Sequence, residues 1–440
     1  MSEKKKQIYV VGHNDPDTGS VCCSAALANL QNRIQDRIKA ENLYTAVCPG
    51  SLQQQTKEIF ELFHTPLPQI MTDARTQTTD VDYSEGISVR EDISLLEAWK
   101  LMRKECRSTL AVTRQDGTLH GVITTGDIAK SYMEAFDNKI LAQAHTPFRN
   151  IVETLNGEQL TGDPQGEVSG GKVSIAAANT DIIRERINPG DVLLLANRYE
   201  AQVCSIEQQA AVMIVCAGTE VSRTILKLAQ EKKCTVITTP FDTYAAARMI
   251  NLSIPVRQFM TTDPVHFQED DYIDDIRPVM MGTRIRDFPI LTADGKYIGM
   301  ISRRHLIDMK RKQFLLVDHN DAASSIRGIE EAEVVGIVDN HSLKTVQTVR
   351  PVPIKTCPVG SCAFIIARMF AEDHLEIDPD TAGLLYAALL YETKGLTASS
   401  VTKADIDAAG ELAGICGDDL TLSVKNILGL TDYTAEGGLN

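Results

Sequence analysis

Apolar and polar residues alternate in blocks that predict a strand, a helix and a second strand near the start of the chain. Residues 8–12 (IYVVG) form a short apolar run that ends at a glycine, which is typical of a buried strand. Residues 20–37 combine small and apolar residues at helical spacing, and residues 43–50 (LYTAVCPG) form the next apolar run. A helical stretch, residues 56–63 (TKEIFELF), follows. We therefore predict a βαβ unit with parallel strands.

A similar pattern returns in the last third of the chain. Residues 314–321 (FLLVDHND) and residues 334–343 (VVGIVDNHSL) each predict a strand that ends in acidic, amide and histidine side chains. Residues 358–366 (PVGSCAFII) open a helix, and residues 382–393 (AGLLYAALLYET) form another that carries Glu392 near its end. Because the carboxyl ends of parallel strands face one crevice in open α/β sheets, we expect these polar groups and those after the first strand to meet.

The middle of the chain contains an internal repeat. Residues 110–133 (LAVTRQDGTLHGVITTGDIAKSYM) match residues 288–310 (FPILTADGKYIGMISRRHLIDMK), and each copy has a strand, an Asp-Gly turn, a second strand and a helix start. Between the copies, residues 190–250 contain three apolar runs (LLLA, AVMIVCAG and CTVITTP) that predict buried parallel strands joined by helices. The expected fold class is α/β: an open, mostly parallel sheet interrupted by a paired α+β module and a small α/β domain.

Composition narrows the function classes. With 440 residues and about 150 residues per domain, roughly three domains fit the chain. A net charge of −15 and the lack of a basic cluster argue against nucleic acid as the main partner. The sequence has no apolar run of about 18 residues, so we expect no membrane span. Its ten cysteines form no CxxC pair, which indicates reduced thiols in a cytoplasmic protein.

Histidine and aspartate follow the first strand in the stretch HNDPD, residues 13–17. Imidazole and carboxylate groups in so tight a turn look like half of a metal site, and leave the identity of the metal open. One such motif alone would mean little. The order HxxxD, DHN, DNH and a late helical carboxylate is a strong signal for a metal site.

Each copy of the repeat has a hydroxyl residue three positions before an acidic residue or a histidine: Thr124 with Asp127, and Ser302 with His305. Free N–H groups at a helix start attract anions such as phosphate. Simple helix capping by Thr124 and Ser302 explains each copy equally well by itself, whereas the pairing of two copies favours a ligand. Four arginines of the second copy suit a polyphosphate, and are otherwise expected on a solvated surface: Arg284, Arg286, Arg303 and Arg304.

The repeat resembles a pair of CBS domains, which bind adenine nucleotides between their two copies. In that family the residues at the helix start contact ribose and phosphate, so the resemblance implies an AMP-, ADP- or ATP-type ligand at the residues just named. Residues 190–250 resemble a DRTGG domain, most closely in residues 238–250 (TTPFDTYAAARMI), although ANR stands where GDR is usual. The implied role of this domain is dimer contact and spacing, without chemistry.

Residues 7–430 resemble the family II inorganic pyrophosphatases of the DHH phosphoesterase superfamily, in the form whose catalytic domain is interrupted by CBS and DRTGG domains. The resemblance implies a hydrolase that splits pyrophosphate with two Mn²⁺ or Co²⁺ ions, is regulated by an adenine nucleotide and forms a homodimer. It also implies this domain order: DHH domain 1–68, CBS domain 69–140, DRTGG-like domain 141–252, CBS domain 253–311 and DHH domain again 312–440.

The resemblance assigns four residues whose type matches the family. His13 and Asp17 bind the first metal, Asp318 bridges both metals, and His341 lies against the substrate phosphate.

Three departures from the family fall on the second metal. Gly19 and Glu392 stand where the family has aspartate, and Asn340 stands where it usually has histidine. Asn340 and Glu392 can still offer oxygen ligands, whereas Gly19 offers none. We therefore expect one tight metal site and a weak or empty second site, which the substitution Gly19→Asp should strengthen.

The family also has a further lobe, which follows a linker and supplies the lysine and arginine that clamp pyrophosphate. This chain ends about where the linker would begin, so reduced activity is expected. Three functions stay open: a nucleotide-regulated pyrophosphatase, a catalytically inactive relative that senses nucleotides or dimerises, and another DHH phosphoesterase. The third would act on oligonucleotides or cyclic dinucleotides, and the acidic charge makes it the least suitable of the three.

Overall fold

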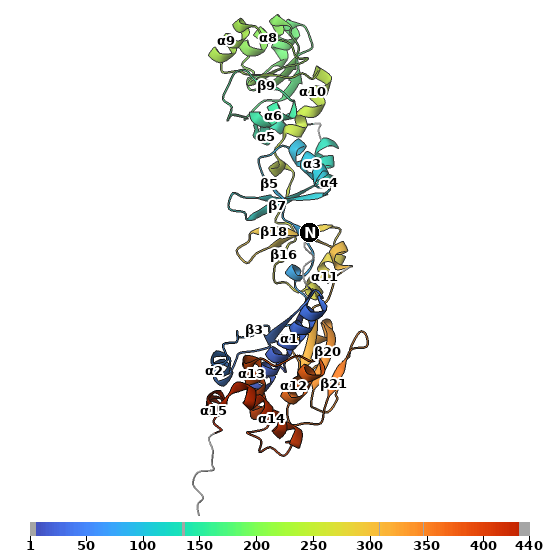
Figure 1. Ribbon diagram of the computed structural model, residues 1–440. Helices are drawn as coiled ribbons and strands as arrows, with labels where there is room; N and C mark the ends of the chain where they lie inside the picture. The colour runs from blue at the N-terminus through green and yellow to red at the C-terminus, as the bar shows by residue number, and fades with distance from the viewer. Residues whose placement is uncertain (1–5, 134–136, 308, 346, 431–440) are drawn as a thin grey trace, which may run out of the picture. The chain divides into compact units, whose positions relative to one another are not determined.

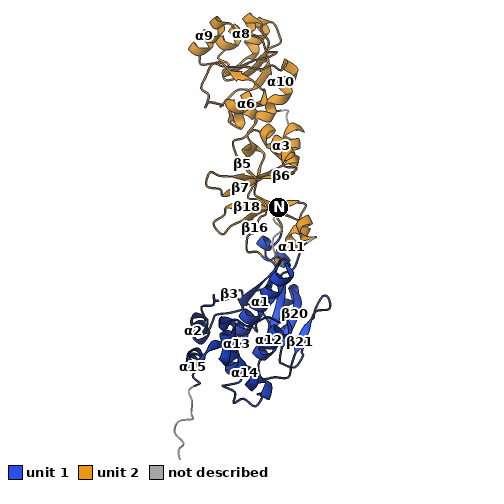
Figure 2. Ribbon diagram, in the orientation of Figure 1, with its two compact units in different colours: residues 1–81, 272–274, 308–440 blue, residues 82–271, 275–307 orange. Residues whose placement is uncertain are grey.

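The computed structural model describes residues 6–133, 137–307, 309–345 and 347–430 (Figure 1). The chain forms two compact units (Figure 2): unit 1 comprises residues 1–81, 272–274 and 308–440, and unit 2 comprises residues 82–271 and 275–307. The two outer parts of the chain therefore belong to one unit. Residues 431–440, where the sequence analysis expects a linker to begin, lie outside the described residues.

Unit 1 contains a parallel sheet with the strand order β21-β20-β19-β1-β2-β3. Its strands in the described residues are β1 (Lys6–Val11), β2 (Asn42–Cys48), β3 (Gln69–Ile70), β19 (Gln313–Val317), β20 (Glu333–Asp339) and β21 (Ile354–Thr356). The strand order reverses between β1 and β19, which pair in parallel. Such a topological switch point is where open α/β sheets bind ligands, at the carboxyl ends of the strands. The predicted parallel sheet is confirmed.

Both faces of this sheet are covered, as the nearly continuous apolar strands require. The helices of unit 1 are α1 (Thr18–Ile38), α2 (Gln54–Leu62), α12 (Cys362–Glu372), α13 (Pro379–Glu392), α14 (Lys403–Cys416) and α15 (Asp418–Ile427). Val10 of β1 lies in a core formed with α1, α12 and α13, whereas its neighbour Val11 lies in a second core with Ile326 and Ile329. Successive side chains of a strand point to opposite faces, so the four central strands β2, β1, β19 and β20 contribute to both cores.

Unit 2 contains the two predicted repeats as two small sheets. The first has the order β15-β7-β6-β5 and the second the order β16-β17-β18-β4. Their strands are β4 (Ser84–Glu85), β5 (Ser88–Arg90), β6 (Thr109–Thr113), β7 (Leu119–Thr124), β15 (Thr261–Thr262), β16 (Phe267–Gln268), β17 (Asp287–Leu291) and β18 (Tyr297–Ser302). The short strand β15, just before the second repeat, pairs with the first sheet, and β4, just before the first repeat, pairs with the second. The two repeats therefore exchange their leading strands.

Matching positions of the two repeats also contact each other. The amide of Leu119 donates to the carbonyl of Gly295 at 3.2 Å, and the amide of Tyr297 donates to the carbonyl of Gly117 at 3.1 Å. These two bonds join corresponding residues in a reciprocal way, so the repeats are related by a local twofold axis.

The helices of the two repeats differ at one point. The repeats carry α3 (Leu95–Lys104), α4 (Thr125–Met133) and α11 (Ile273–Gly282). After β18, where the sequence predicted a helix start, the chain forms a 3₁₀ turn, Arg303–Leu306. Ile307 donates to the carbonyl of Arg304, three residues back, at 3.2 Å, which is the 3₁₀ pattern.

A third sheet of unit 2 contains the predicted parallel strands between the repeats, in the order β11-β12-β13-β14-β9. Its strands are β9 (Glu158–Gln159), β11 (Val173–Ile175), β12 (Val192–Leu195), β13 (Val212–Val215) and β14 (Thr235–Thr238). The surrounding elements are α5 (Ile140–Gln143), β8 (Thr146–Pro147), α6 (Phe148–Thr154), β10 (Glu167–Val168), α7 (Thr180–Arg186), α8 (Tyr199–Glu207), α9 (Arg223–Glu231) and α10 (Thr243–Met249). The central strands β12, β13 and β14 are buried and pair in parallel, as predicted.

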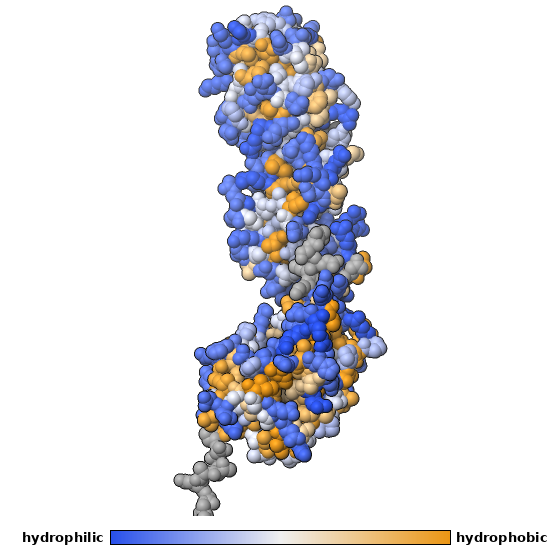
Figure 3. Space-filling view, viewed as in Figure 1, coloured by the Kyte–Doolittle hydropathy of each residue, from blue (hydrophilic) through white to orange (hydrophobic). Residues whose placement is uncertain are grey.

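The surface carries polar and apolar areas (Figure 3). On the visible face, unit 2 is mostly hydrophilic with separate apolar patches, and unit 1 shows apolar residues in the region of α12, α13 and α14. Among the described residues, no helix is both long enough and apolar enough to cross a membrane.

Candidate metal centre and a second, arginine-lined cavity

The predicted metal-site residues meet at the carboxyl ends of β1, β19 and β20. A cavity of about 630 Å³ lies there, in unit 1. All six residues that the sequence analysis assigned to metal binding or to the phosphate line it: His13, Asp17, Asp318, Asn340, His341 and Glu392. The expectation that these distant parts of the sequence converge is therefore met by the geometry.

His13, Asp17 and Asp318 form one group in this cavity, with one ligand atom of each within 4.8 Å of the others. The Nε2 atom of His13 lies 3.6 Å from Oδ2 of Asp17 and 3.6 Å from Oδ2 of Asp318. Asp17 is the N-cap of α1, and its Oδ1 accepts the amide of Ser20 at 2.8 Å. The cap fixes one oxygen of Asp17, which leaves the other directed to His13.

The pKa values of His13 and Asp17 move in opposite directions. Burial lowers the pKa of His13, but the hydrogen bond to Asp17 and the charges of Asp17 and Asp318 outweigh burial and raise it. Burial raises the pKa of Asp17, but the hydrogen bonds from His13 and Ser20 outweigh it and lower the pKa. In the metal-free protein the pair therefore favours a protonated imidazole beside a carboxylate, and a bound cation would take the place of that proton.

Asp318 is the residue on which the site is centred. It follows β19 with a φ of +63°, in the left-handed region that non-glycine residues rarely adopt. Its side chain is 5% exposed, and burial together with the charges of Glu392 and Asp17 raises its pKa well above the usual range. Its Oδ2 faces His13, whereas its Oδ1 lies 3.8 Å from Nδ1 of His341. One carboxylate thus presents its two oxygens to two different groups.

The second group consists of Asp318, Asp339 and His341, again with ligand atoms within 4.8 Å of one another. Asp339 ends β20 and is fully buried. Its Oδ1 lies 2.8 Å from Nδ1 of His341, and its Oδ2 accepts a hydrogen bond from the side-chain Nδ2 of Asn320. The hydrogen bond to Asp339 raises the pKa of His341. Sequence reasoning did not name Asp339 as a site residue, although it stands directly before Asn340 and His341.

Asn340 and Glu392, the two altered residues of the second metal site, both lie beside Cys362. The Oδ1 atom of Asn340 is 3.1 Å from Sγ of Cys362, and its Nδ2 donates to the carbonyl of Val359 at 3.2 Å. Oε2 of Glu392 accepts the amide of Cys362 at 3.1 Å. Burial and the nearby charge of Asp17 raise the pKa of Glu392 to about 8. Both oxygens are therefore held at the wall of the cavity.

The donor set fits a divalent cation. Three carboxylates, those of Asp17, Asp318 and Glu392, converge with His13 on one partly buried cavity. Among the described residues that line it, Lys344 is the one lysine or arginine, and its Nζ lies 3.2 Å from Oδ2 of Asp321. Buried carboxylates are paired or bind metals, and mixed imidazole and carboxylate donors suit Mn²⁺ or Co²⁺.

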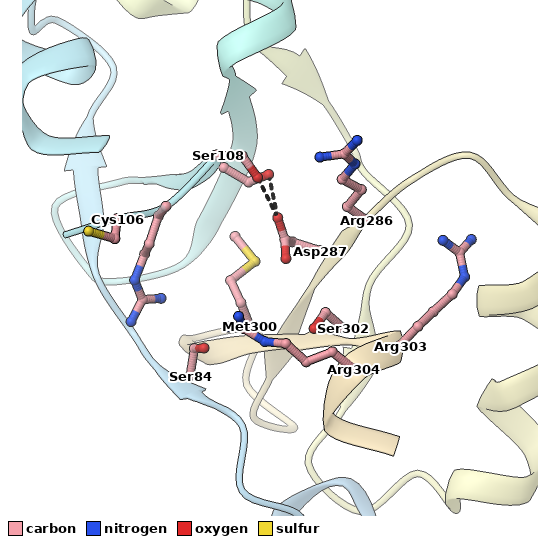
Figure 4. A pocket seen from close by; sticks show the side chains of 11 residues that line it. Ser84, Cys106, Ser108, Arg286, Asp287, Met300, Ser302, Arg303 and Arg304 are labelled. Carbon is pink, nitrogen blue, oxygen red and sulfur yellow. Dashed lines mark hydrogen bonds between the residues drawn. The ribbon is translucent and has the colours of Figure 1, made fainter. Parts of the chain in front are cut away.

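A second cavity, of about 380 Å³, lies between the two repeats of unit 2 (Figure 4). Its lining combines hydroxyl groups with four arginines: Arg107, Arg286, Arg303 and Arg304. The carboxylate of Asp287 accepts hydrogen bonds from Ser108 at 3.2 Å and Thr109 at 2.8 Å. Arginines therefore outnumber carboxylates in this lining, although the chain as a whole is acidic. This balance suits a polyanionic ligand.

Four of the predicted nucleotide residues line this cavity: Ser302, Arg286, Arg303 and Arg304. Arg303 also donates to the carbonyl of Met280 at 2.8 Å, so part of its guanidinium is engaged by the fold. Sequence reasoning missed Arg107, which precedes the first repeat copy, because it falls outside the matched segment.

The other predicted nucleotide residues, Thr124, Asp127, His305 and Arg284, are not in its lining. Thr124 and Asp127 cap each other: the Thr124 hydroxyl donates to Asp127 at 2.7 Å, and the Asp127 amide donates back at 3.1 Å. Ser302 and His305 repeat this box, with the Ser302 amide donating to Nδ1 of His305 at 2.9 Å. Capping is therefore a role that both helix starts have in the structure.

Comparison with known proteins shows similarity to one class of enzyme along most of the chain. A cobalt-dependent inorganic pyrophosphatase of Clostridium perfringens is 33% identical over 417 residues, which cover 94% of this chain and 74% of the relative. A probable manganese-dependent inorganic pyrophosphatase of Thermotoga maritima is 28% identical over 96% of this chain and 76% of the relative. The similarity thus extends across both units.

The inserted region has matches of its own. The CBS domain family matches residues 78–134 and 256–312, and the DRTGG domain family matches residues 150–253. The solved CBS and DRTGG domains of the regulatory region of the Clostridium perfringens pyrophosphatase are 32% identical, with a TM-score of 0.50. The match covers 52% of this chain and the whole of the solved chain. The solved structure is a complex with the activator diadenosine tetraphosphate.

Proposed function

The chain belongs to the manganese- or cobalt-dependent inorganic pyrophosphatases that carry CBS and DRTGG domains, and from this we propose that it hydrolyses pyrophosphate to two phosphates under the control of an adenine nucleotide. One observation carries the proposal: Asp318 directs one oxygen to His13 and the other to His341. A carboxylate with this placement would be able to serve two metal ions. When bound, a pair of divalent ions lowers the pKa of water and offsets charge on the attacking and leaving oxygens.

In this proposal, His13, Asp17 and Asp318 would hold the first Mn²⁺ or Co²⁺ ion. Asp318, Asn340 and Glu392 would hold the second ion.

His341 contacts the substrate phosphate. Its Nδ1 faces Asp339, which sets the orientation of the ring and leaves Nε2 for the phosphate. The exposed ammonium group of Lys344, at the rim of the same cavity, offsets negative charge on pyrophosphate.

The regulatory ligand is proposed to be an adenine nucleotide at the repeats of unit 2. The arginine-lined cavity takes the phosphates. Thr124 with Asp127 and Ser302 with His305 stand at corresponding positions of the two repeats. A ligand with two adenosine ends joined by phosphates, such as diadenosine tetraphosphate, matches this local twofold symmetry.

A phosphate-release assay on the full chain with Co²⁺ or Mn²⁺ tests the proposed reaction. We expect release from pyrophosphate, and none from a short oligonucleotide or a cyclic dinucleotide. The variant His341→Gln should lose most of the activity without loss of metal. Hydrolysis of the nucleotide substrates alone would identify another DHH phosphoesterase. Nucleotide binding without any hydrolysis would identify an inactive, nucleotide-sensing relative.

Two further properties of the family resemblance are proposed for this chain, a homodimer and a cytoplasmic location. All ten cysteines lie in the described residues and are free thiols there, which suits a reducing compartment. Apolar side chains such as Ile406, Ile415 and Leu422 are exposed on α14 and α15 and could contribute to self-association. Sedimentation of the metal-loaded protein measures the oligomeric state directly.

A further inference from the structure

Gly19 has no backbone reason to be a glycine. It lies in the first turn of α1, is buried, and its φ is outside the left-handed region in which glycine is favoured. Glycine within a helix costs about 1 kcal/mol relative to alanine. Some other feature of this position must therefore exclude a side chain.

The excluding feature is the side chain of Glu392. A Cβ atom at position 19 would lie 2.6 Å from Oε1 and 2.8 Å from Cγ of Glu392. Such distances are well inside van der Waals contact, which begins at about 3.5 Å. The acidic side chain of α13 therefore fills the volume that a side chain on α1 would need.

Contacts on its other side hold the Glu392 carboxylate in this place. Oε2 accepts the amide of Cys362, the first residue of α12, at 3.1 Å, while Oε1 faces the first turn of α1. The carboxylate thus lies beside the first turns of both α1 and α12. Glu392 also lines the cavity of the candidate metal centre, together with Asp17 and Asp318.

We propose that Gly19 and Glu392 are a matched pair, in which the glycine gives the longer acid room to direct its carboxylate past α1 to the second metal position. One carboxylate would then serve where an aspartate at each position would supply two. The inference rests on the proposed function, because it concerns the second ion of that site. It also reverses the expectation from the sequence that Gly19→Asp strengthens the second site. By itself, Gly19→Asp should displace Glu392 and lower the affinity for the second ion.

Equilibrium dialysis of the metal-free full chain against Co²⁺ alone, with bound cobalt measured by elemental analysis, tests the pair without any assay of activity. The parent should show one tighter and one weaker ion. Gly19→Ala should lower the affinity for the more weakly bound ion by at least about tenfold. This is the lower end of the range for loss of a supporting residue. The affinity for the more tightly bound ion should change by less than about threefold.

Gly410→Ala is the matched control. Gly410 also lies in a helix, α14, and a Cβ atom there would meet no other atom within 4 Å. This control should leave both ions unchanged and keep or raise the melting temperature of the metal-free protein. Gly19→Ala should lower that melting temperature, despite the better helix propensity of alanine.

Glu392→Gln separates a role in metal binding from a role in packing. The glutamine side chain has nearly the same shape as glutamate but no charge. The metal-free variant should therefore have a melting temperature no lower than that of the parent, while binding of the weaker ion is lost. The double variant Gly19→Asp/Glu392→Asp should recover the weaker ion that Gly19→Asp loses. Recovery of this kind is non-additive, as expected for residues in contact.

Three results would overturn the proposal that Gly19 and Glu392 are a matched pair. They are a weaker ion unaffected by Gly19→Ala, a gain of the weaker ion in Gly19→Asp alone, or a parent chain that binds a single ion while it hydrolyses pyrophosphate. A parent that binds no Co²⁺ at all would instead overturn the proposed function, so the two failures are distinguishable.

Discussion

At the scale of single residues, the candidate metal centre is a set of polar side chains held in places that are unfavourable without a cation. Asp318 has a left-handed backbone and a nearly buried carboxylate, and Asp339 is fully buried. Residues in sparsely populated backbone regions persist when the surrounding structure imposes them, and they cluster at functional sites. The strain and burial of Asp318 are therefore explained by what its two oxygens face.

Asp318→Asn is expected to separate metal binding from folding. Asparagine tolerates the left-handed backbone, so the turn is kept. Affinity for the tighter ion should fall by more than about 100-fold, beyond the 10- to 100-fold that loss of an outer-shell partner costs. Cobalt dialysis measures this loss, and Asp321→Asn, in the lining of the same cavity, serves as the control.

The same variant has an expected pH dependence in the metal-free state. The pKa of Asp318 is raised in the folded protein, so the folded state binds more protons than the unfolded state. Stability from this group is present below about pH 4, the ordinary pKa of an aspartate, and is lost as the pH rises above it. The melting temperature of Asp318→Asn minus that of the parent should therefore grow from about pH 4 towards neutral pH. A difference that shrinks with rising pH would contradict the assigned direction.

At the scale of elements, apolar runs and strand ends predicted much of the fold and of the site. The runs before His13, Asp318 and His341 form β1, β19 and β20, and the parallel sheet brings their ends to one edge. Other features depend on packing that periodicity does not contain. The exchange of β4 and β15 involves two-residue strands, which are too short for a pattern. The contact between Gly19 and Glu392 depends on how closely α1 packs against α13.

The arginine-lined cavity makes a prediction about the two repeats as elements. Arg286→Ala should weaken the binding of diadenosine tetraphosphate about 10- to 100-fold, because a hydrogen bond to a charged group contributes about 1.5–3 kcal/mol. Titration calorimetry on the full chain measures the change. Arg114→Ala removes an arginine of the first repeat that lies outside the cavity lining, and its binding should stay within about twofold of the parent. Equal losses in the two variants would point to general electrostatics rather than to this cavity.

At the scale of the whole molecule, unit 2 interrupts unit 1: apart from residues 272–274, the chain belongs to unit 2 from residue 82 to residue 307. Regulation in such a chain is a coupling free energy between two binding events, and its size is the same in both directions. If the nucleotide changes the affinity for Co²⁺ by some factor, Co²⁺ must change the affinity for the nucleotide by that factor. This reciprocity concerns binding and does not extend to the catalytic rate.

The coupling is expected to lie between about 5-fold and 150-fold, the usual range for allosteric proteins. The coupling factor can be measured in two ways. One is titration of diadenosine tetraphosphate with and without saturating Co²⁺, and the other is titration of Co²⁺ with and without the nucleotide. In Asp318→Asn, which binds the tighter ion poorly, the nucleotide affinity should become independent of Co²⁺ while its value in the metal-free state is kept. In Arg286→Ala the affinity for Co²⁺ without nucleotide should equal that of the parent. A nucleotide affinity in the parent that ignores Co²⁺ would show that the two units bind independently, and any regulation would then have to act on the catalytic rate alone.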